Sequence, residues 1–504
     1  MTKWLLILVL LLGAVLRLYK LGTVPPSLYW DEASLGYNAY SIATTLRDEH
    51  GVFLPHDSFA AFGDYKPVGY IYAAAPFVKI LGLTEIAVRL PSAIAGILLV
   101  LASYLLVTEL TRNRKWALLA ALFIAVSPWS LQMSRAAFEA NLATCFTAFG
   151  VWFFLRRNLL AAVFFALAMY TFNSHRVFVP LLVGLLSIYR FQFKQLIILA
   201  ILLLPLVPHL MSPEGKLRFN EVTWINDLSI VETANKNIAD NNNVLWAKVV
   251  YNRRVLYAGE FLRHYFDHYR FDFLFQAGDI NPRLSSRSVG EMYLLDFPLV
   301  ILGIFSLIKK HNKTAFLILA WLILGPIPAA FARETPHALR ILNVLPVPQI
   351  IAAIGAVQLF KSLKQLKFLK ILISVSLSIS VFLYLRNYFF VYPEKYSGDW
   401  QYGYKQMVEY VAAAQKDYDY IDVTNHYGRP YIYFLFYNRY DPQKYWQSRQ
   451  ASRDQFGFWS VAGFDKYIFN NKPPKGKILY IRAPEESGGG HKIVKQLDSF
   501  ILYE

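Results

Sequence analysis

The sequence predicts a mainly α protein, a polytopic membrane helix bundle of about eleven spanning helices that is followed by a small extracytoplasmic α/β domain. The 504 residues are 56% hydrophobic and 16% aromatic, which is more apolar than is usual for a soluble domain. Hydrophobic runs recur over residues 1–390, whereas residues 391–504 are polar and rich in tyrosine. We therefore expect a transmembrane domain over 1–390 and a soluble domain over 391–504.

The apolar runs are the candidates for the spanning helices. They cover residues 5–18, 67–83, 87–106, 116–131, 142–155, 159–170, 177–189, 196–210, 293–308, 314–331, 341–360 and 368–390. Several are shorter than the roughly 20 residues that cross a bilayer upright. Either their polar flanks contribute or some of these runs do not cross.

Short basic clusters indicate the topology, because cytoplasmic loops are enriched in lysine and arginine. All the clusters lie inside if the N-terminus is cytoplasmic and the run 67–83 lies along the outer interface. The protein is then a multi-pass plasma membrane protein with an extracytoplasmic C-terminal domain. A model with an external N-terminus and one more span also fits the later clusters. The clusters that follow every second run are at residues 112–115, 156–157, 190–194, 309–313 and 361–370.

The net charge of +17 does not indicate a nucleic-acid partner, because the basic residues form no single basic face. The preferred topology places four polar stretches on one outer face, residues 19–66, 127–141, 171–176 and 332–340. Aromatic and small residues in the first of them predict interfacial juxtamembrane helices.

Two adjacent acids, Asp31 and Glu32, directly follow the first apolar run in Tyr29-Trp30-Asp31-Glu32-Ala33. A carboxylate near bilayer depth is costly, so such acids usually face a cavity, a partner charge or a substrate. The alternative is that they cap a helix beginning near Ala33.

Further candidates lie in the same outer stretches. Gly63-Asp64-Tyr65-Lys66-Pro67 brings Lys66 to headgroup level, where it contacts a phosphate or only snorkels. Arg135 and Glu139 are four residues apart, so they pair with each other on one helix or serve a site.

Two His–Arg pairs complete the set of candidates: His175 with Arg176, and His337 with Arg340. Arginine suits bidentate phosphate contact and histidine can donate to an oxyanion. The alternative for both pairs is a polar boundary of the membrane.

Carboxylates beside cations suit displacement of a lipid-linked phosphate by an acceptor hydroxyl. A carboxylate removes the hydroxyl proton as the sugar carbon becomes positive, and cations stabilise the departing phosphate. One base and no covalent intermediate give inversion at the anomeric carbon.

Three motifs carry a resemblance to a known family: Trp30-Asp31-Glu32-Ala33, Asp64-Tyr65-Lys66-Pro67, and Glu85-Ile86-Ala87-Val88-Arg89-Leu90-Pro91-Ser92-Ala93. Together they resemble the bacterial members of the protein O-mannosyltransferase and aminoarabinose transferase group of the glycosyltransferase C superfamily. That superfamily uses polyprenyl-phosphate sugars on the outer face. The resemblance covers roughly residues 1–390 and is strongest over the first 180.

The resemblance implies an inverting glycosyltransferase that moves a hexose or pentose from a polyprenyl-phosphate donor to a hydroxyl of a protein, lipid or cell-envelope glycan. It assigns Asp31, Glu32 and Glu139 to catalysis, although many relatives have Asp-Ala where this chain has Glu139-Ala140. Substrate-binding residues are then Asp64, Tyr65, Lys66, Arg135, His175, Arg176, His337 and Arg340, the last four by position rather than by a sharp motif.

Other functions remain open at this stage. A transporter or flippase of lipid-linked sugars is also polytopic, although transporters commonly show repeated halves, and this sequence shows none. A scaffold subunit with a decayed site is a third hypothesis. No cofactor or metal site is predicted, although the three acids have the oxygen ligands that suit a divalent ion.

Overall fold

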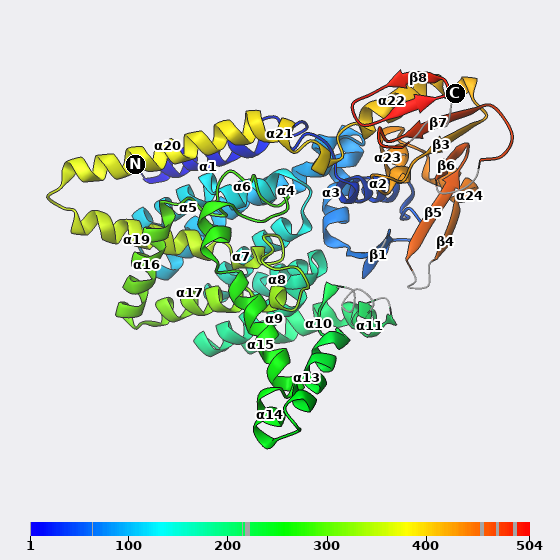
Figure 1. The fold of residues 1–504 in the computed structure, drawn as a ribbon. Coiled ribbons are helices and arrows are strands. Elements are labelled where there is room, and N and C mark those ends of the chain that lie inside the picture. Colours follow the sequence, from blue (N-terminus) through cyan, green and yellow to red (C-terminus); the bar gives the residue numbers. More distant parts are fainter. Residues whose placement is uncertain are drawn as a thin grey trace. The chain divides into compact units, whose positions relative to one another are not determined.

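The computed structural model describes residues 2–62, 64–213, 215–216, 222–453, 458–469, 473–486 and 491–504, and it forms two compact units (Figure 1). The first, here the helical unit, comprises Met1–Leu16, Ala95–Met133 and Ala140–Leu385. The second, here the site unit, comprises Arg17–Ile94, Ser134–Glu139 and Arg386–Glu504. The predicted division at residue 390 falls close to the last boundary but does not anticipate that the tail joins the first loop in one unit.

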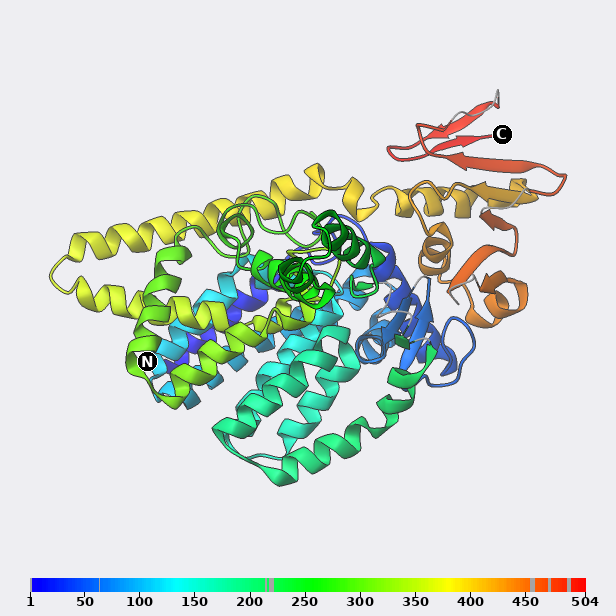
Figure 2. The ribbon, with the colours of Figure 1, turned by 60° about the horizontal axis from the view of Figure 1, so that its bottom comes forward.

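The helical unit is built from apolar helices connected by short turns. In Figure 2 helices α8, α9 and α10 lie next to one another. Its helices are α1 (Thr2–Leu18), α4 (Glu85–Thr111), α5 (Arg114–Val126), α6 (Pro128–Arg135), α7 (Glu139–Leu155), α8 (Leu160–Thr171), α9 (Asn173–Tyr189), α10 (Phe193–Leu203), α11 (Val207–Met211), α13 (Leu228–Asp240), α14 (Leu245–Val250), α15 (Arg253–Asp267), α16 (Asp296–Lys310), α17 (Lys313–Leu324), α18 (Ile327–Ala330), α19 (Val347–Ser362) and α20 (Lys367–Arg386), with α1, α4, α6, α7 and α20 crossing a unit boundary.

Among the described residues, four helical segments are long and apolar enough to span a membrane: Glu85–Thr111, Phe193–Met211, Lys313–Ala330 and Lys367–Lys395. The bent pair α5 and α6 makes a fifth if it is one span, and further apolar helices are shorter. The predicted multi-pass helical protein is confirmed, whereas the number of eleven spans stays a prediction. Helix α3 (Gly69–Leu81) has only 13 residues, about 20 Å at 1.5 Å per residue, so it is too short to cross upright.

Glycine allows α16 and α19 to approach closely. A Cβ added to Gly355 would lie 1.8 Å from the Leu299 carbonyl oxygen, and one added to Gly303 would lie 2.1 Å from that of Ile351. Small residues at such crossings let helix backbones touch and gain dispersion contacts. An alanine at either position would force the two helices apart.

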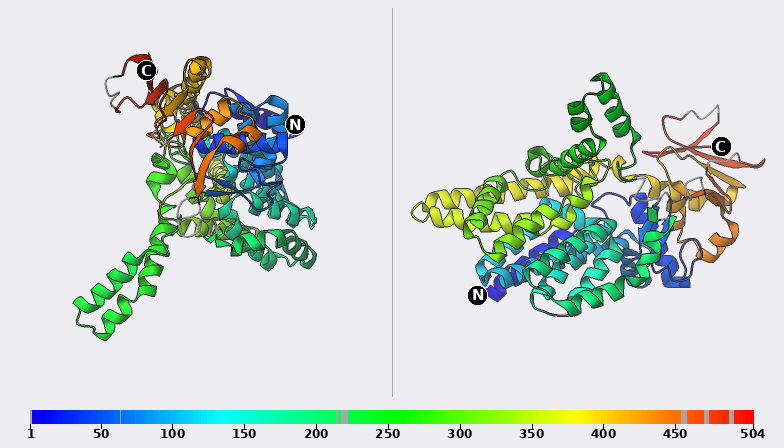
Figure 3. Two further views of the ribbon diagram at one scale, coloured as in Figure 1. Left: turned by 90° about the vertical axis from the view of Figure 1, so that its right-hand side faces the viewer. Right: turned by 90° about the horizontal axis from the view of Figure 1, so that it is seen from below.

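Helices α13, α14 and α15 form an arm that projects from the other helices of the unit (Figure 3). The sequence predicts one surface helix over residues 244–269, and the structure has two. The chain breaks at Tyr251, and Asn252 begins the next helix by accepting a bond from the Arg254 N–H at 3.0 Å. Asparagine is a preferred residue at this capping position.

The site unit contains a seven-stranded mixed sheet with the strand order β4-β5-β6-β3-β7-β9-β8. Strand β3 lies in the middle and runs parallel to both β6 and β7. The sequence predicts strands over 418–424 and 477–481 and a helix over 400–415, and these correspond to β3, β7 and α22. The elements of the tail are α21 (Tyr392–Lys395), α22 (Tyr404–Ala414), β3 (Tyr420–Val423), α23 (Pro430–Tyr437), α24 (Pro442–Ser448), β4 (Gln450–Arg453), β5 (Trp459–Phe464), β6 (Tyr467–Phe469), β7 (Ile478–Arg482), β8 (Ile493–Gln496) and β9 (Ile501–Tyr503).

The first loop packs against this tail through helices α2 (Trp30–Thr45) and α23. Gly36 on α2 permits the contact, because a Cβ there would lie 2.6 Å from the side chains of both Phe436 and Val88. The loop also contains the hairpin β1 (Ser58–Ala61) and β2 (Asp64–Pro67), in which Lys66 is paired with Phe59.

Candidate active site

Helix α2 begins at Trp30, three residues before the start near Ala33 that the capping alternative assumes, so both acids lie in its first turn. Tyr29 precedes the helix, and its backbone N–H donates to Oε2 of Glu32 at 3.3 Å, as in a capping box. Asp31 and Glu32 are successive helical residues, so their side chains point in different directions. Glu32 caps the helix, whereas Asp31 does not take part in this capping contact.

Glu32 is buried and fully engaged. Its two carboxylate oxygens accept bonds from Nε of Arg89 at 2.9 Å and Nη2 at 3.0 Å, and the Ala137 N–H donates to Oε1 at 2.8 Å. Arg89 also donates to the carbonyl groups of Leu21 and Pro25 at 3.1 and 2.9 Å. This pair therefore ties three separate segments of the chain together at the base of α2.

Lys66 lies between the two other acids. Its Nζ is 2.7 Å from Oδ1 of Asp31 and 4.0 Å from Oε1 of Glu139. The side chain of Asp31 is 43% exposed, whereas those of Lys66 and Glu139 are 6% and 12% exposed. We call these three residues the Asp31–Lys66–Glu139 cluster. It combines one accessible carboxylate with a shielded ammonium group.

The neighbours of Lys66 on β2 lie differently. Successive side chains on a strand point to opposite faces, and Tyr65 is buried with its ring centroid 6.2 Å from that of Phe458. Tyr65 therefore packs against Phe458. The side chain of Asp64 falls outside the part of the chain that the structure describes.

Arg135 is buried at the end of α6, and α7 begins only at Glu139, so one continuous helix does not link the two residues. The Arg135 guanidinium donates to the carbonyl groups of Arg17, Tyr19 and Val24 at 2.9, 2.7 and 2.8 Å. It also lies over the Phe389 ring, 4.8 Å from the centroid. Arg135 thus fixes the backbone where the first helix ends and the first loop begins.

The tail supports the start of α2 through Gln401. Its Oε1 accepts a bond from the Trp30 N–H at 3.1 Å and lies 2.6 Å from the Tyr433 hydroxyl. The same hydroxyl is 3.1 Å from the Leu28 carbonyl oxygen. The backbone of Leu28 and Trp30, at the start of the helix, is therefore held by residues of the tail.

The two predicted His–Arg pairs belong to the helical unit. His175 is fully buried between Phe172 and Phe178, and neither ring nitrogen has a hydrogen-bond partner among the described residues. Nε of Arg176 donates to the Met169 carbonyl group at 3.2 Å. Their role at a donor phosphate stays a prediction.

His337 and Arg340 lie in a loop that Asp279 anchors. The Asp279 carboxylate accepts a bond from the Ala338 N–H at 2.7 Å. Burial, followed by the nearby Arg340 guanidinium, lowers the pKa of His337 well below its usual value, so its imidazole is neutral at physiological pH. Asp279 lies in a polar turn to which the sequence assigns no role.

Glu291 provides a pH-dependent contribution to this region. Burial, and next the Asp279 carboxylate, raise the pKa of Glu291 well above its usual value of 4.5. The folded protein then holds a proton that the unfolded chain releases, so stability falls as pH rises above about 4.5. Glu291→Gln cannot titrate but keeps an oxygen for the Asp279 N–H, which donates to Oε1 at 3.0 Å.

We expect the wild-type melting temperature to fall more steeply than that of Glu291→Gln between about pH 5 and about pH 8. Thermal denaturation of the purified protein in detergent measures both curves. Parallel curves would show that Glu291 does not carry a raised pKa.

Comparison with known proteins gives one family match. Residues 7–185 match the family model described as dolichyl-phosphate-mannose-protein mannosyltransferase. These residues are a domain of that family. The mannosyltransferase-family domain includes Asp31, Lys66, Arg89 and Glu139. Comparison with curated proteins yields no match.

Solved structures extend the likeness beyond the mannosyltransferase-family domain. ArnT from Cupriavidus metallidurans bound to undecaprenyl phosphate is 11% identical with a TM-score of 0.56, covering 100% of this chain and 98% of that one. Its apo state is 12% identical with a TM-score of 0.54 over the same shares. At this identity the likeness shows the fold, which here includes the C-terminal domain.

The archaeal oligosaccharyltransferase AglB from Archaeoglobus fulgidus, in complex with an inhibitory peptide and a dolichol-phosphate, is also similar. It is 12% identical with a TM-score of 0.48, covering 86% of this chain and 63% of that one. This chain therefore spans less than two thirds of that protein's length. The predicted resemblance to the protein mannosyltransferase family is confirmed by the family match over residues 7–185.

Proposed function

We propose that this protein is an inverting glycosyltransferase that moves a sugar from a polyprenyl-phosphate donor to an acceptor hydroxyl at the outer face of the membrane. The observation that carries the proposal is the Asp31–Lys66–Glu139 cluster, in which an accessible carboxylate lies 2.7 Å from a shielded ammonium group. The neighbouring acid Glu32 is a positioning residue, because its oxygens are bound to Arg89 and to backbone N–H groups.

In the proposed step, the Asp31 carboxylate takes the proton of the acceptor hydroxyl. The hydroxyl oxygen forms a bond to the anomeric carbon on the face opposite the phosphate, and the bond from that carbon to the phosphate oxygen breaks. The polyprenyl phosphate leaves with the electron pair, so the configuration inverts. Because Asp31 is 43% exposed, it can then release its proton to water.

Lys66 stabilises the departing phosphate in this scheme. A lysine is a compact point charge that binds phosphate without a fixed geometry, and a shielded position strengthens its electrostatic effect. In the absence of donor the ammonium group is bound to Asp31. We propose that donor binding draws Lys66 toward the phosphate and so frees the Asp31 carboxylate to act as a base.

We further propose that Lys66, rather than a divalent metal ion, is the counter-charge of the two acids. The ammonium group lies between Asp31 and Glu139 at 2.7 and 4.0 Å, where a cation bridging these carboxylates would have to bind. Transfer is then insensitive to a chelator. The proposed topology has the N-terminus in the cytoplasm and the C-terminal domain outside.

The test is transfer from radiolabelled polyprenyl-phosphate sugars in membranes that contain the full-length protein, with and without EDTA. Separating lipids, glycans and proteins afterwards identifies the acceptor class. We expect label in one fraction, and we expect Lys66→Gln to lower kcat/KM by about 10–100-fold, since hydrogen bonds to charged groups contribute about 1.5–3 kcal/mol.

A matched control for Lys66→Gln is Lys405→Gln, which removes a lysine of the same unit that pairs with Glu85 at 2.9 Å. Its transfer should stay close to that of the wild type. Equal losses in both variants would mean that the change at Lys66 disturbs the fold rather than the donor, and loss of transfer in EDTA would contradict the metal-free scheme.

A further inference from the structure

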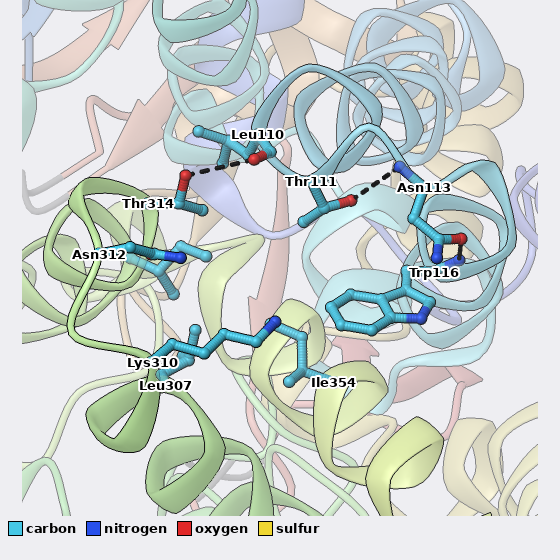
Figure 4. Close-up of a pocket in the computed structure, with 10 residues that line it drawn as sticks. Leu110, Thr111, Asn113, Trp116, Leu307, Lys310, Asn312, Thr314 and Ile354 are labelled. Atoms are coloured by element: carbon cyan, nitrogen blue, oxygen red, sulfur yellow. Dashed lines mark hydrogen bonds between the residues drawn. The ribbon is translucent and has the colours of Figure 1, made fainter. Parts of the chain in front are cut away.

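A polar cleft lies in the helical unit, between the α4–α5 turn and the α16–α17 turn (Figure 4). Its volume is about 170 Å³, and its lining contains no carboxylate among the described residues. The Thr314 hydroxyl donates to the Leu110 carbonyl group at 3.2 Å and links the two turns. None of these residues belongs to the site unit.

Two ammonium groups share one aromatic ring, that of Trp116, which lines this cleft together with Lys310. Nζ of Lys310 lies 4.4 Å from the centroid of the Trp116 ring, and Nζ of Lys361 lies 5.4 Å from the same centroid. The ring stabilises each cation through its quadrupole, but two positive charges this close together repel each other. An anion bound between them would remove that repulsion.

Two asparagine side chains add neutral donors. Oδ1 of Asn113 accepts bonds from the N–H groups of Lys115 and Trp116 at 3.0 and 3.2 Å, and Oδ1 of Asn312 accepts one from Ala315 at 2.8 Å. These contacts orient each amide, so that its oxygen faces the backbone and its NH2 group remains a donor. Both side chains line the cleft.

Apolar side chains on the same helices indicate where such an anion comes from. Phe305 and Ile308 on α16 are 65% and 52% exposed, and Phe316 on α17 is 53% exposed. In a membrane protein these residues face acyl chains. The acyl chains of a lipid would contact these apolar side chains when its phosphate is bound. A free phosphate has no acyl chains and would make no use of them.

We propose that this cleft binds the phosphate group of an anionic phospholipid, held by Lys310, Lys361 and the two asparagine amides. The basic clusters of the sequence predict that this end of the bundle is cytoplasmic, where anionic lipids attract lysine and arginine. The site is separate from the proposed transfer reaction and does not depend on it.

The experiment measures phosphatidylglycerol bound to the purified full-length protein by titration and native mass spectrometry, with phosphatidylcholine as the neutral lipid. We expect Lys310→Gln combined with Lys361→Gln to weaken phosphatidylglycerol binding by roughly tenfold or more. The control pair, Lys309→Gln with Lys364→Gln, removes two exposed lysines outside the cleft and should change it by about twofold or less.

Inorganic phosphate separates the two sources of the ligand. Displacement of phosphatidylglycerol by millimolar phosphate would support recognition of the phosphate group alone, while retention of the lipid would support a lipid headgroup. Replacing both lysines by arginine should preserve binding. Unchanged binding in the Lys310→Gln and Lys361→Gln variant, or an equal loss in the control pair, would overturn the proposal.

Discussion

Asp31→Asn should lower the rate of sugar transfer by about 10²–10⁴-fold, the range that general-base catalysis commonly contributes. The amide keeps the size of the side chain and an oxygen that can accept the bond from Lys66, which is 2.7 Å long in the wild type. It cannot take the proton of the acceptor hydroxyl. We therefore expect the loss in kcat rather than in the KM for donor. Initial rates at several donor concentrations separate the two parameters.

A matched control for Asp31→Asn is Asp399→Asn, which makes the same change of charge at an exposed position of the same unit. It should keep the wild-type rate. Glu139→Gln should cause a smaller loss than Asp31→Asn, because its carboxylate lies 4.0 Å from Lys66 and is only 12% exposed. A wild-type rate in Asp31→Asn together with a large loss in Glu139→Gln would transfer the role of base to Glu139.

Arg89→Met should destabilise the folded protein by about 3–5 kcal/mol, the cost of removing one partner from a buried ion pair. The Glu32 carboxylate would remain 3% exposed without its counter-charge, and the Leu21 and Pro25 carbonyl groups would lose their donor. Loss of monodisperse protein on heating in detergent measures the effect. Adding Glu32→Gln to this variant should restore part of the stability, because the buried charge is then gone.

The comparison for Arg89→Met is Lys477→Met, which breaks an exposed pair with Glu504 at 2.9 Å in the same unit. Solvent screens an exposed pair, which therefore adds little to stability, so this variant should melt close to the wild type. If Arg89→Met melted with it, the Arg89–Glu32 pair would not be what fixes the start of α2.

The sequence predicts which side chains converge better than it predicts what each one does. Asp31, Lys66 and Glu139 come from three distant stretches, and the rule that basic loops stay in the cytoplasm places all three on one side of the membrane. Adjacent acids cannot be told apart in this way. Only burial separates Glu32, which is 3% exposed, from Asp31, which is 43% exposed.

Two further residues show why other contacts of the candidate site were not predicted from the sequence. Arg89 stands in an apolar helix, and a charge in such a run is expensive unless it is paired. This energetic cost indicates, from the sequence alone, that Arg89 has a partner of opposite charge. Gln401 gave no such signal, because an amide in a polar tail is ordinary and its contact with Trp30 depends on the folded tail. The spacing of Arg135 and Glu139 was misleading because the helix ends between them.

The contact between Gln401 and the Trp30 N–H joins residues 371 positions apart. A ribosome therefore releases the first loop long before it makes the segment that completes α2. Membrane insertion of the intervening helices must precede this closure, which makes Asp31, the proposed catalytic acid, late to reach its final surroundings. Nascent chains would thus carry an unfinished site until the segment around Gln401 has been synthesised.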